Sequence, residues 1–379
     1  MRKKNQATKV FTKPELSPVF LYNKRMEKIM KQHKIQQLLV SSPKSIAYYT
    51  GLEIDPQERF LALLIHQDGR HQIFSNALFL IEPTPAYEVI EHFDHENPVI
   101  GLESYLTGST IGIDRWLRAE FVFELQQQFP EKTFVDGSEI IEGIQAIKTS
   151  EEIDKMKEAS RLNDLVMEDI IKELNVGVTE KEIEEKLRIA FKKVGADGPS
   201  FDPIIAFGEN GANPHAGVSD RALKAGESIV LDFGCIKDGY CSDMTRTYFL
   251  NENPLKPVYD LVLQAQLAAI EAIKPGACFA DVDQAARQLI EAKGYGTQFF
   301  HRLGHGIGKE VHEPFDVSGN NLRLIQPGMC FSIEPGIYLE GVGGIRIEDL
   351  VYVDEQGYGQ VLNHVPKDRE VLHQTTKGK

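Results

Sequence analysis

The stretch Phe300-His301-Arg302-Leu303-Gly304-His305-Gly306-Ile307-Gly308 places two histidines and an arginine among three glycines, and His312-Glu313-Pro314 follows shortly after it. Three further segments mix glycine with histidine or acidic residues in a similar way, at positions 213–217, 229–247 and 331–349. A single histidine or aspartate is most often a surface or turn residue, so no one member of the set predicts a site. Four of the chain's 11 histidines fall in these segments, and this recurrence indicates one shared functional site.

The acidic residues of these segments stand at the ends of apolar, strand-like runs or inside them. Asp232, Glu334 and Glu348 all occupy such positions. Burying an unpaired carboxylate is costly, and carboxylates that converge repel one another and raise one another's pKa. Two divalent cations would balance the charges of these three residues and Asp243, and neutral His305 would add a fifth ligand. An oxygen-rich set with one imidazole suits Mn, Co, Fe or Zn better than a cysteine-rich zinc site would.

Composition and charge exclude several other classes of function. The chain has 379 residues and a net charge of −14, whereas phosphate binding needs a dense basic surface, so nucleic acid is not an expected partner. The densest apolar run, residues 60–65, is far shorter than the ~18–20 residues of a membrane span, so no membrane partner is expected either. No apolar segment follows the basic N-terminus, as it would in a secretory signal. The four cysteines form no Cys-x-x-Cys pair, which is typical of reduced thiols in a cytoplasmic protein.

The chain is predicted to have three parts. Residues 1–17 are polar and basic and predict a mobile N-terminal extension. Residues 18–147 alternate short apolar runs with helix-like segments, which predicts an α/β domain. Thr149 and Glu152 then form a capping box ahead of a long helix, and a second box follows at Thr179. We therefore predict a separate α+β catalytic domain over residues 148–379.

A pattern of two helices followed by glycine-rich strands occurs twice in this second domain. Glycines bound the second helix of each pair with the same spacing, at residues 177–195 and 276–294. Apolar residues also coincide between the copies, as at Ala190 and Leu289. The pattern predicts an internal pseudo-twofold repeat.

The ordered series Asp, Asp, His, Glu, Glu resembles the ligand set of the pita-bread metallopeptidases, which include methionine aminopeptidase, Xaa-Pro aminopeptidase and prolidase. The resemblance spans residues 151–372. The first domain resembles the N-terminal domain of prolidases and creatinase through Val40-Ser41-Ser42-Pro43 and Tyr49-Thr50-Gly51. The stretch at 300–308 is most similar to the Xaa-Pro dipeptidases of lactic-acid bacteria. The ligands that this resemblance implies are Asp232, Asp243, His305, Glu334 and Glu348.

The resemblance also implies which of the two metal ions each ligand binds. Asp232 would bind one metal ion, His305 and Glu334 the other, and Asp243 and Glu348 both. Glu334 would in addition accept a proton during the reaction.

Other polar residues acquire roles from the same resemblance. His215 and His312 match the family's outer histidines, whose hydrogen bonds can reach the substrate carbonyl and the developing oxyanion. Arg346 lies two residues before Glu348 and, in an alternating strand, would share its face and form an orienting ion pair. His301 would line the same pocket.

The implied activity is hydrolysis of Xaa-Pro dipeptides by a homodimeric enzyme with two divalent ions, of which Mn²⁺ fits best and Co²⁺ or Zn²⁺ also fit. The Xaa-Pro amide has no N–H and its ring fixes the backbone, so a protease that grips an extended strand is at a disadvantage. A dipeptidase must instead recognise the free carboxylate on proline, for which a planar arginine is the natural partner. Arg302 is the first candidate, and the loop at residues 55–59 is the second.

Three alternatives remain open from the sequence. An Xaa-Pro aminopeptidase would act on longer peptides with the same metal set. A creatinase-like amidinohydrolase would not need all five ligands. A metal-free binding module on the same fold would have lost ligands that this chain retains.

Overall fold

The computed structural model describes residues 18–368 and 371–372, with the side chains of residues 18–24 left out. The predicted extension at residues 1–17 lies outside the described residues. The chain divides into two compact units after Gln145. Within the described residues, none of the helices combines the length and the apolar character that crossing a membrane requires.

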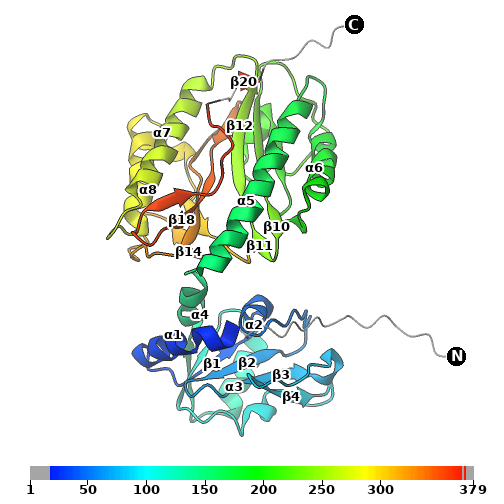
Figure 1. The fold of residues 1–379 in the computed structure, drawn as a ribbon, viewed down its shortest axis with the longest axis vertical. Coiled ribbons are helices and arrows are strands. Elements are labelled where there is room, and N and C mark those ends of the chain that lie inside the picture. The colour runs from blue at the N-terminus through cyan, green and yellow to red at the C-terminus, as the bar shows by residue number, and fades with distance from the viewer. Residues whose placement is uncertain (1–17, 369–370, 373–379) are drawn as a thin grey trace, which may run out of the picture. The chain divides into compact units, whose positions relative to one another are not determined.

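The N-terminal unit is a six-stranded sheet in the order β4-β3-β2-β1-β5-β6, with parallel pairing at β3–β4, β1–β5 and β5–β6 (Figure 1). Its strands are β1 (Gln37–Val40), β2 (Ala62–His66), β3 (Gln72–Asn76), β4 (Glu88–His92), β5 (Thr110–Ile113) and β6 (Thr133–Asp136). Its helices are α1 (Pro18–Gln32), α2 (Pro43–Thr50), α3 (Ala119–Gln128) and α4 (Ser138–Gln145).

Helices cover both faces of this sheet, so its central strand β1 is buried on both sides. Leu38 and Val40 pack into a core with α1, α2 and α4, whereas Leu39 packs into a second core with α3. Successive side chains of a strand point to opposite faces, and a strand buried on both faces reads as one continuous apolar run.

The C-terminal unit is built from two similar halves. The first half contains α5 (Ser150–Ile170), α6 (Glu180–Val194), β8 (Ile204–Phe207), β9 (Ser228–Phe233) and β12 (Met244–Leu250). The second contains α7 (Lys256–Ala272), α8 (Phe279–Ala292), β13 (Gly304–Gly306), β14 (Glu313–Val317), β15 (Cys330–Ile333) and β18 (Asp349–Val353). The smaller strands are β7 (Gly198–Pro199), β10 (Cys235–Lys237), β11 (Tyr240–Cys241), β16 (Gly336–Leu339), β17 (Gly343–Arg346), β19 (Gly359–Val361) and β20 (Val371–Leu372).

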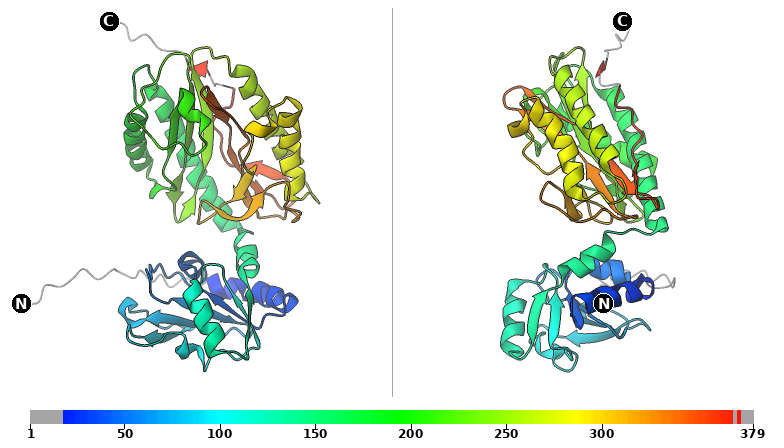
Figure 2. Two further views of the ribbon diagram at one scale, coloured as in Figure 1. Left: turned by 180° about the vertical axis from the view of Figure 1, so that it is seen from behind. Right: turned by 90° about the vertical axis from the view of Figure 1, so that its left-hand side faces the viewer.

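Each half has its own sheet and its own apolar core. The first sheet runs β20-β12-β9-β8 and the second β14-β13-β15-β18-β19. Helices α5 and α6 lie side by side on one flank and α7 and α8 on the other, as Figure 2 also shows. This arrangement confirms the pita-bread fold with its internal repeat. Of the apolar pairs that coincide between the two copies, Ile183 and Val282 are both buried, whereas Ala190 is buried and Leu289 is 39% exposed.

The capping boxes that begin α5 and α6 are both present. At Thr149 and again at Thr179 the hydroxyl accepts from the third backbone N–H of the helix, and a glutamate side chain accepts from the N-cap backbone. Gly195 ends α6 with φ of 81°, a left-handed conformation that glycine adopts without a steric penalty.

A tight crossing of two backbone segments fixes the approach of β9 to β12. A Cβ atom on Gly234 would lie 1.8 Å from the Ser242 carbonyl oxygen, so only glycine fits there. The Ser242 backbone N–H donates to the Cys235 carbonyl oxygen at 2.8 Å, and the Cys235 N–H donates to the Ser242 hydroxyl at 2.8 Å. The crossing lies between Asp232 and Asp243 and sets how closely these two residues approach.

We predict that Gly234→Ala destabilises the C-terminal unit by about 1–3 kcal/mol, since the added methyl forces the two segments apart. Thermal unfolding measures the loss. Gly198→Ala is the matched control, because a Cβ atom at Gly198 meets nothing within 4 Å. Equal melting temperatures for the two variants would show that the crossing tolerates a side chain.

Candidate metal centre

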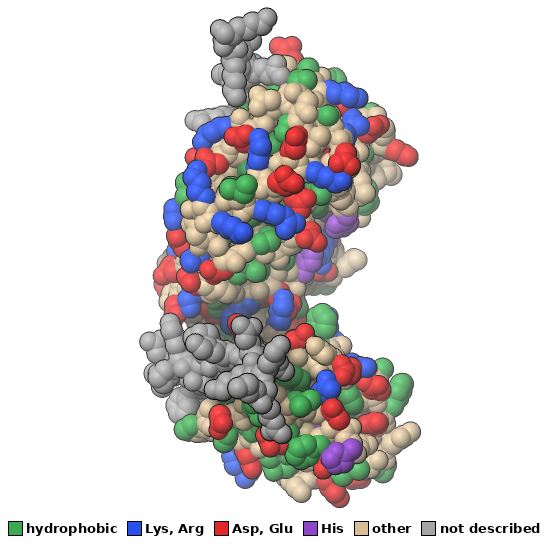
Figure 3. Space-filling view, turned by 90° about the vertical axis from the view of Figure 1, so that its right-hand side faces the viewer, with side chains coloured by type: hydrophobic (Ala, Val, Ile, Leu, Met, Phe, Trp, Pro, Cys, Tyr) green, Lys and Arg blue, Asp and Glu red, His purple; other side chains and the backbone are tan. Residues whose placement is uncertain are grey.

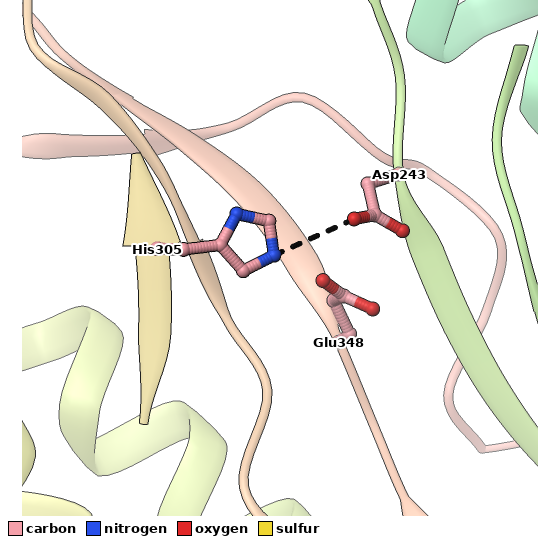
Figure 4. Close-up of side chains that lie close together, drawn as sticks. All are labelled: Asp243, His305 and Glu348. Atoms are coloured by element: carbon pink, nitrogen blue, oxygen red, sulfur yellow. Dashed lines mark ion pairs between the residues drawn. The ribbon is translucent and has the colours of Figure 1, made fainter. Parts of the chain in front are cut away.

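Strand ends from both halves of the C-terminal unit carry the predicted ligands. Asp232 lies in β9 and Asp243 directly precedes β12, whereas His305 lies in β13, Glu334 follows β15 and Glu348 precedes β18. Asp243, His305 and Glu348 are buried and offer ligand atoms within 4.8 Å of one another. Figure 4 shows these three side chains pointing toward a common point from three different strands.

Glu334 and Asp232 join this group through direct contacts. His305 Nε2 lies 3.3 Å from Glu334 Oε1 and 3.6 Å from Asp243 Oδ2. His305 Nδ1 lies 3.1 Å from the Gly306 carbonyl oxygen, which can only accept, so Nδ1 carries the proton and Nε2 presents a lone pair. Asp232 is close enough to Asp243 for the two carboxyl groups to interact directly. The structure therefore brings all five predicted ligands to one place.

Several carboxylate oxygens of this cluster are buried and have no hydrogen-bond partner. They are Asp232 Oδ1, Asp243 Oδ1 and Glu348 Oε1. A buried, unsatisfied carboxylate oxygen costs free energy unless a cation or donor meets it. The donor set of four carboxylates and one neutral imidazole, with orphan oxygens directed inward, fits a divalent metal group.

The pKa shifts of the cluster residues also indicate a site for a divalent metal group. Burial, together with the carboxylates of Asp232 and Glu334, holds the pKa of Asp243 well above its ordinary value. Burial and the Asp243 carboxylate raise the pKa of Glu348 in the same way. Burial lowers the pKa of His305 to about 4, so the imidazole is neutral at physiological pH. Without cations the cluster would hold protons, and cations would release them.

Arg346 pairs with Asp232, and the sequence-based pairing of Arg346 with Glu348 is wrong. Arg346 Nη2 donates to Asp232 Oδ2, and Nε donates to the Thr245 hydroxyl at 3.0 Å. The Thr245 hydroxyl in turn donates to Glu348 Oε2 at 2.7 Å. Arg346 ends β17, whereas Glu348 lies beyond that strand, so the alternation assumed from sequence does not reach Glu348.

Thr245 and Tyr338 were missed by the sequence analysis. Thr245 is fully buried and links Arg346 to a ligand. Its position two residues after Asp243 at the start of a strand was the available signal. Burial raises the pKa of Tyr338 to about 12, so its neutral hydroxyl accepts from Arg346 Nη1 at 2.9 Å and can donate to His301 Nε2 at 3.1 Å.

The three remaining histidines lie around the cluster. The His312 ring meets the His305 ring edge-on, with centroids 4.3 Å apart. His215 and His312 are exposed at the surface, whereas His301 is partly buried beside Tyr338. On the face drawn in Figure 3, acidic and basic side chains are interspersed and histidine side chains are exposed.

Arg302 and the loop at residues 55–59 have partners of their own. Arg302 Nη1 donates to Asp316 Oδ1; the Arg302 side chain is partly buried and Asp316 is exposed. In the N-terminal unit, Arg59 Nε donates to Asp94 at 2.9 Å. Within the described residues of the C-terminal unit, Arg302 makes no hydrogen bond or ion pair with a ligand of the cluster.

An open cavity of about 810 Å³ has Tyr338 in its wall, and the Tyr338 hydroxyl accepts from Arg346, the partner of Asp232. Its wall includes residues 209–219 in part, together with Phe300 and Glu340. Arg346 donates to the Pro214 carbonyl oxygen at 3.3 Å and thereby joins this wall to Asp232.

Comparison with known families and proteins identifies the chain. Residues 154–355 match the model of metallopeptidase family M24, and residues 23–147 match the creatinase/prolidase N-terminal domain. The chain belongs to metallopeptidase family M24. Members of this family bind a dinuclear divalent metal centre, in agreement with the cluster above.

Relatives and solved structures match the chain over nearly its whole length. An uncharacterized peptidase of Staphylococcus aureus is 38% identical over 86% of this chain and 94% of its own. The prolidase of Thermococcus sibiricus is 32% identical with a TM-score of 0.84, covering 93% of this chain and 99% of its own. The X-Pro aminopeptidase of Thermotoga maritima is 30% identical with a TM-score of 0.79, covering 92% and 99%.

We predict that Asp243→Asn raises the melting temperature of the chelated M24 enzyme, because one of several repelling buried charges is removed. Each kcal/mol gained is ~2–4 °C in a unit of this size. The raised pKa values mean that the metal-free enzyme loses stability as pH rises, so the gain is larger at mildly alkaline than at mildly acidic pH.

Added Mn²⁺ should stabilise the unsubstituted enzyme and leave the Asp243→Asn variant almost unaffected, as thermal unfolding with and without the ion will show. Asp202→Asn, at an exposed position, is the control for loss of charge alone. A variant that is stabilised by Mn²⁺ as strongly as the parent would remove Asp243 from the ligand set.

Proposed function

We propose that this M24 metallopeptidase is a prolidase, which hydrolyses Xaa-Pro dipeptides and releases proline. The single observation that carries the proposal is the convergence of four carboxylates and one neutral imidazole in one buried cluster, which Arg346 and Tyr338 connect to an open cavity. Full-length similarity to proteins named prolidase and X-Pro aminopeptidase supports the choice of a proline-directed activity.

The five cluster residues are proposed to hold two divalent ions. Asp232 would bind one ion, His305 and Glu334 the other, and Asp243 and Glu348 both. Two such ions would acidify a water molecule and supply a nucleophile at neutral pH. Mn²⁺ is our first candidate, with Co²⁺ and Zn²⁺ as alternatives, because oxygen-rich sets with one imidazole suit these ions.

Proton transfer and charge stabilisation fall to residues at the rim of the cluster. We assign Glu334 as the proton acceptor, since it lies at 3.3 Å from His305 and is held by the Ser332 hydroxyl at 3.1 Å. His215 and His312 are proposed to donate hydrogen bonds to the substrate carbonyl and to the developing oxyanion. Arg346 is proposed to orient Asp232, to which it donates. His301 is not among the described residues that line the cavity, and its proposed contribution to the pocket is to hold Tyr338, whose hydroxyl lies 3.1 Å from its Nε2.

The carboxylate of the substrate requires a cationic partner. Arg302 is our candidate, since it lies three residues before His305, and its charge contributes after burial to the lowered pKa of that histidine. Asp316 already binds one edge of its guanidinium, and an arginine presents five N–H donors, so a second carboxylate can bind the free edge.

The proposal also covers the localisation of the enzyme, its oligomeric state and its ligands. We place the enzyme in the cytoplasm, which the four free cysteines support, and we propose a homodimer by analogy with its family. Small peptides are the proposed ligands.

The second candidate function is an Xaa-Pro aminopeptidase, which the similarity to the Thermotoga maritima enzyme favours. The two functions share their metal chemistry and differ in the length of the substrate. A metal-free binding module is the third and least supported, because the orphan carboxylate oxygens would then be uncompensated.

We predict that the purified enzyme cleaves Leu-Pro faster than Leu-Pro-Gly, and that chelation abolishes both activities until Mn²⁺ or Co²⁺ is restored. Proline release measured by chromatography distinguishes the functions. Faster cleavage of the tripeptide would assign the enzyme as an aminopeptidase. Full activity in protein shown by elemental analysis to be metal-free would refute the mechanism.

We further predict that Arg302→Ala raises the KM for Leu-Pro by about 10- to 100-fold, because a charge-assisted hydrogen bond contributes about 1.5–3 kcal/mol. The KM for Leu-Pro amide, which has no charge to lose, should change far less. Asp316→Asn serves as the control, since it breaks the same ion pair and keeps the guanidinium. Equal losses on the acid and the amide would exclude Arg302 as the carboxylate receptor.

A further inference from the structure

Glu180 is a fully buried carboxylate at the start of α6, beside the N-cap Thr179. Its Oε1 accepts from the Phe207 backbone N–H at 2.8 Å and from Asn210 Nδ2 at 2.9 Å. Its Oε2 accepts from the Ser219 backbone N–H at 2.9 Å and from the Ser219 hydroxyl at 2.6 Å. Both oxygens are therefore satisfied by neutral donors.

These donors lie at the two ends of one segment, residues 207–219. Between them the chain forms a short 3-10 helix at Gly208–Ala212 and then passes through His215. Asn210, Ser219 and several residues between them line the 810 Å³ cavity. Glu180 thus holds together both ends of the segment that forms one wall of the cavity, which we name the His215 segment.

The middle of the His215 segment is attached to the metal centre. Arg346 Nη1 donates to the Pro214 carbonyl oxygen at 3.3 Å, while Nη2 of the same side chain donates to Asp232. With Glu180 at the ends and Arg346 at the centre, the segment has three fixed points. These three attachments fix the position of His215 relative to Asp232.

A carboxylate at position 180 suits this arrangement better than a neutral side chain would. A carboxylate accepts up to about four hydrogen bonds and no other side chain of this size accepts as many. The positive end of the α6 dipole also favours a carboxylate in the first turn. A glutamine would turn an N–H₂ group toward donors, which leaves at least one buried donor unsatisfied.

We propose that Glu180 is a positioning residue, which sets the His215 segment at the correct distance from the metal centre and so determines how the substrate is held in the cavity. It touches neither metal ligand nor substrate and acts only through the segment. The effect on catalysis rests on the proposed prolidase function, whereas the effect on the segment does not.

The test compares Glu180→Gln with Glu185→Gln, which makes the same change at an exposed position of the same helix. Hydrogen exchange followed by mass spectrometry should show faster exchange over residues 207–219 in Glu180→Gln and little change over 228–233 in β9. Bound Mn²⁺ per chain, measured by elemental analysis, should equal that of the parent.

Hydrolysis of Leu-Pro should slow down when the His215 segment loses its fixed position. We expect kcat/KM per metal-loaded enzyme to drop about 10- to 100-fold, the range that follows from misplacing a reacting group by about 1 Å. Glu185→Gln should leave both readouts unchanged. A parent enzyme without activity on Xaa-Pro substrates refutes the proposed function alone, because the exchange result still decides the role of Glu180.

Asn210→Ala provides a second variant in case Glu180→Gln fails to fold, since it removes one donor and leaves the carboxylate in place. It should reproduce the faster exchange over 207–219 to a smaller degree. Unchanged exchange in that segment, or a loss of activity that only follows a loss of metal, would overturn the assignment of Glu180.

Discussion

Negative charge held in a small, buried volume is the constraint on which the catalytic unit depends. Asp243 and Glu348 are fully enclosed and keep orphan oxygens, and Asp232 and Glu334 add charge beside them. A chain that buries such a set must hold it rigidly, since carboxylates that were free to separate would turn outward to water. Strand ends and backbone hydrogen bonds supply that rigidity, and a flexible loop would not.

The two-fold construction of the fold meets this requirement. Asp232 and Asp243 come from the first half, and His305, Glu334 and Glu348 come from the second. Hydrogen bonds cross between the halves at the cluster, because the Glu348 backbone N–H donates to the Thr245 carbonyl oxygen at 3.0 Å. The guanidinium of Arg246 also donates to the Glu348 carbonyl oxygen at 2.5 Å. The complete ligand set therefore exists only where the two halves are packed together.

The sequence predicted the features that local chemistry determines. The capping residues at Thr149 and Thr179, the repeated helix pairs and the ordered acidic residues all follow from short-range patterns, and the ligand series specified the family. The partners of the two arginines could not be predicted from the sequence. Arg346 binds Asp232, in a strand more than a hundred residues away, and Arg302 binds Asp316 across a hairpin. Thr245 was missed for the same reason, since a lone threonine in a strand is ordinary until its neighbours are known.

Other acidic side chains in the C-terminal unit have hydrogen-bond or ion-pair partners, and in this they differ from the cluster. Glu180 has neutral donors on both oxygens, Glu313 pairs with the enclosed Lys148 at 2.7 Å, and Asp349 pairs with Arg246 at 2.6 Å. The fold thus satisfies each of these carboxylates either with neutral donors or with a basic side chain. At the cluster, the described residues supply four acids with one guanidinium, one neutral imidazole and the hydroxyls of Thr245 and Ser332, and three buried carboxylate oxygens keep no partner. A deficit of positive charge confined to the point where five strand ends meet is the arrangement that a pair of divalent cations would complete.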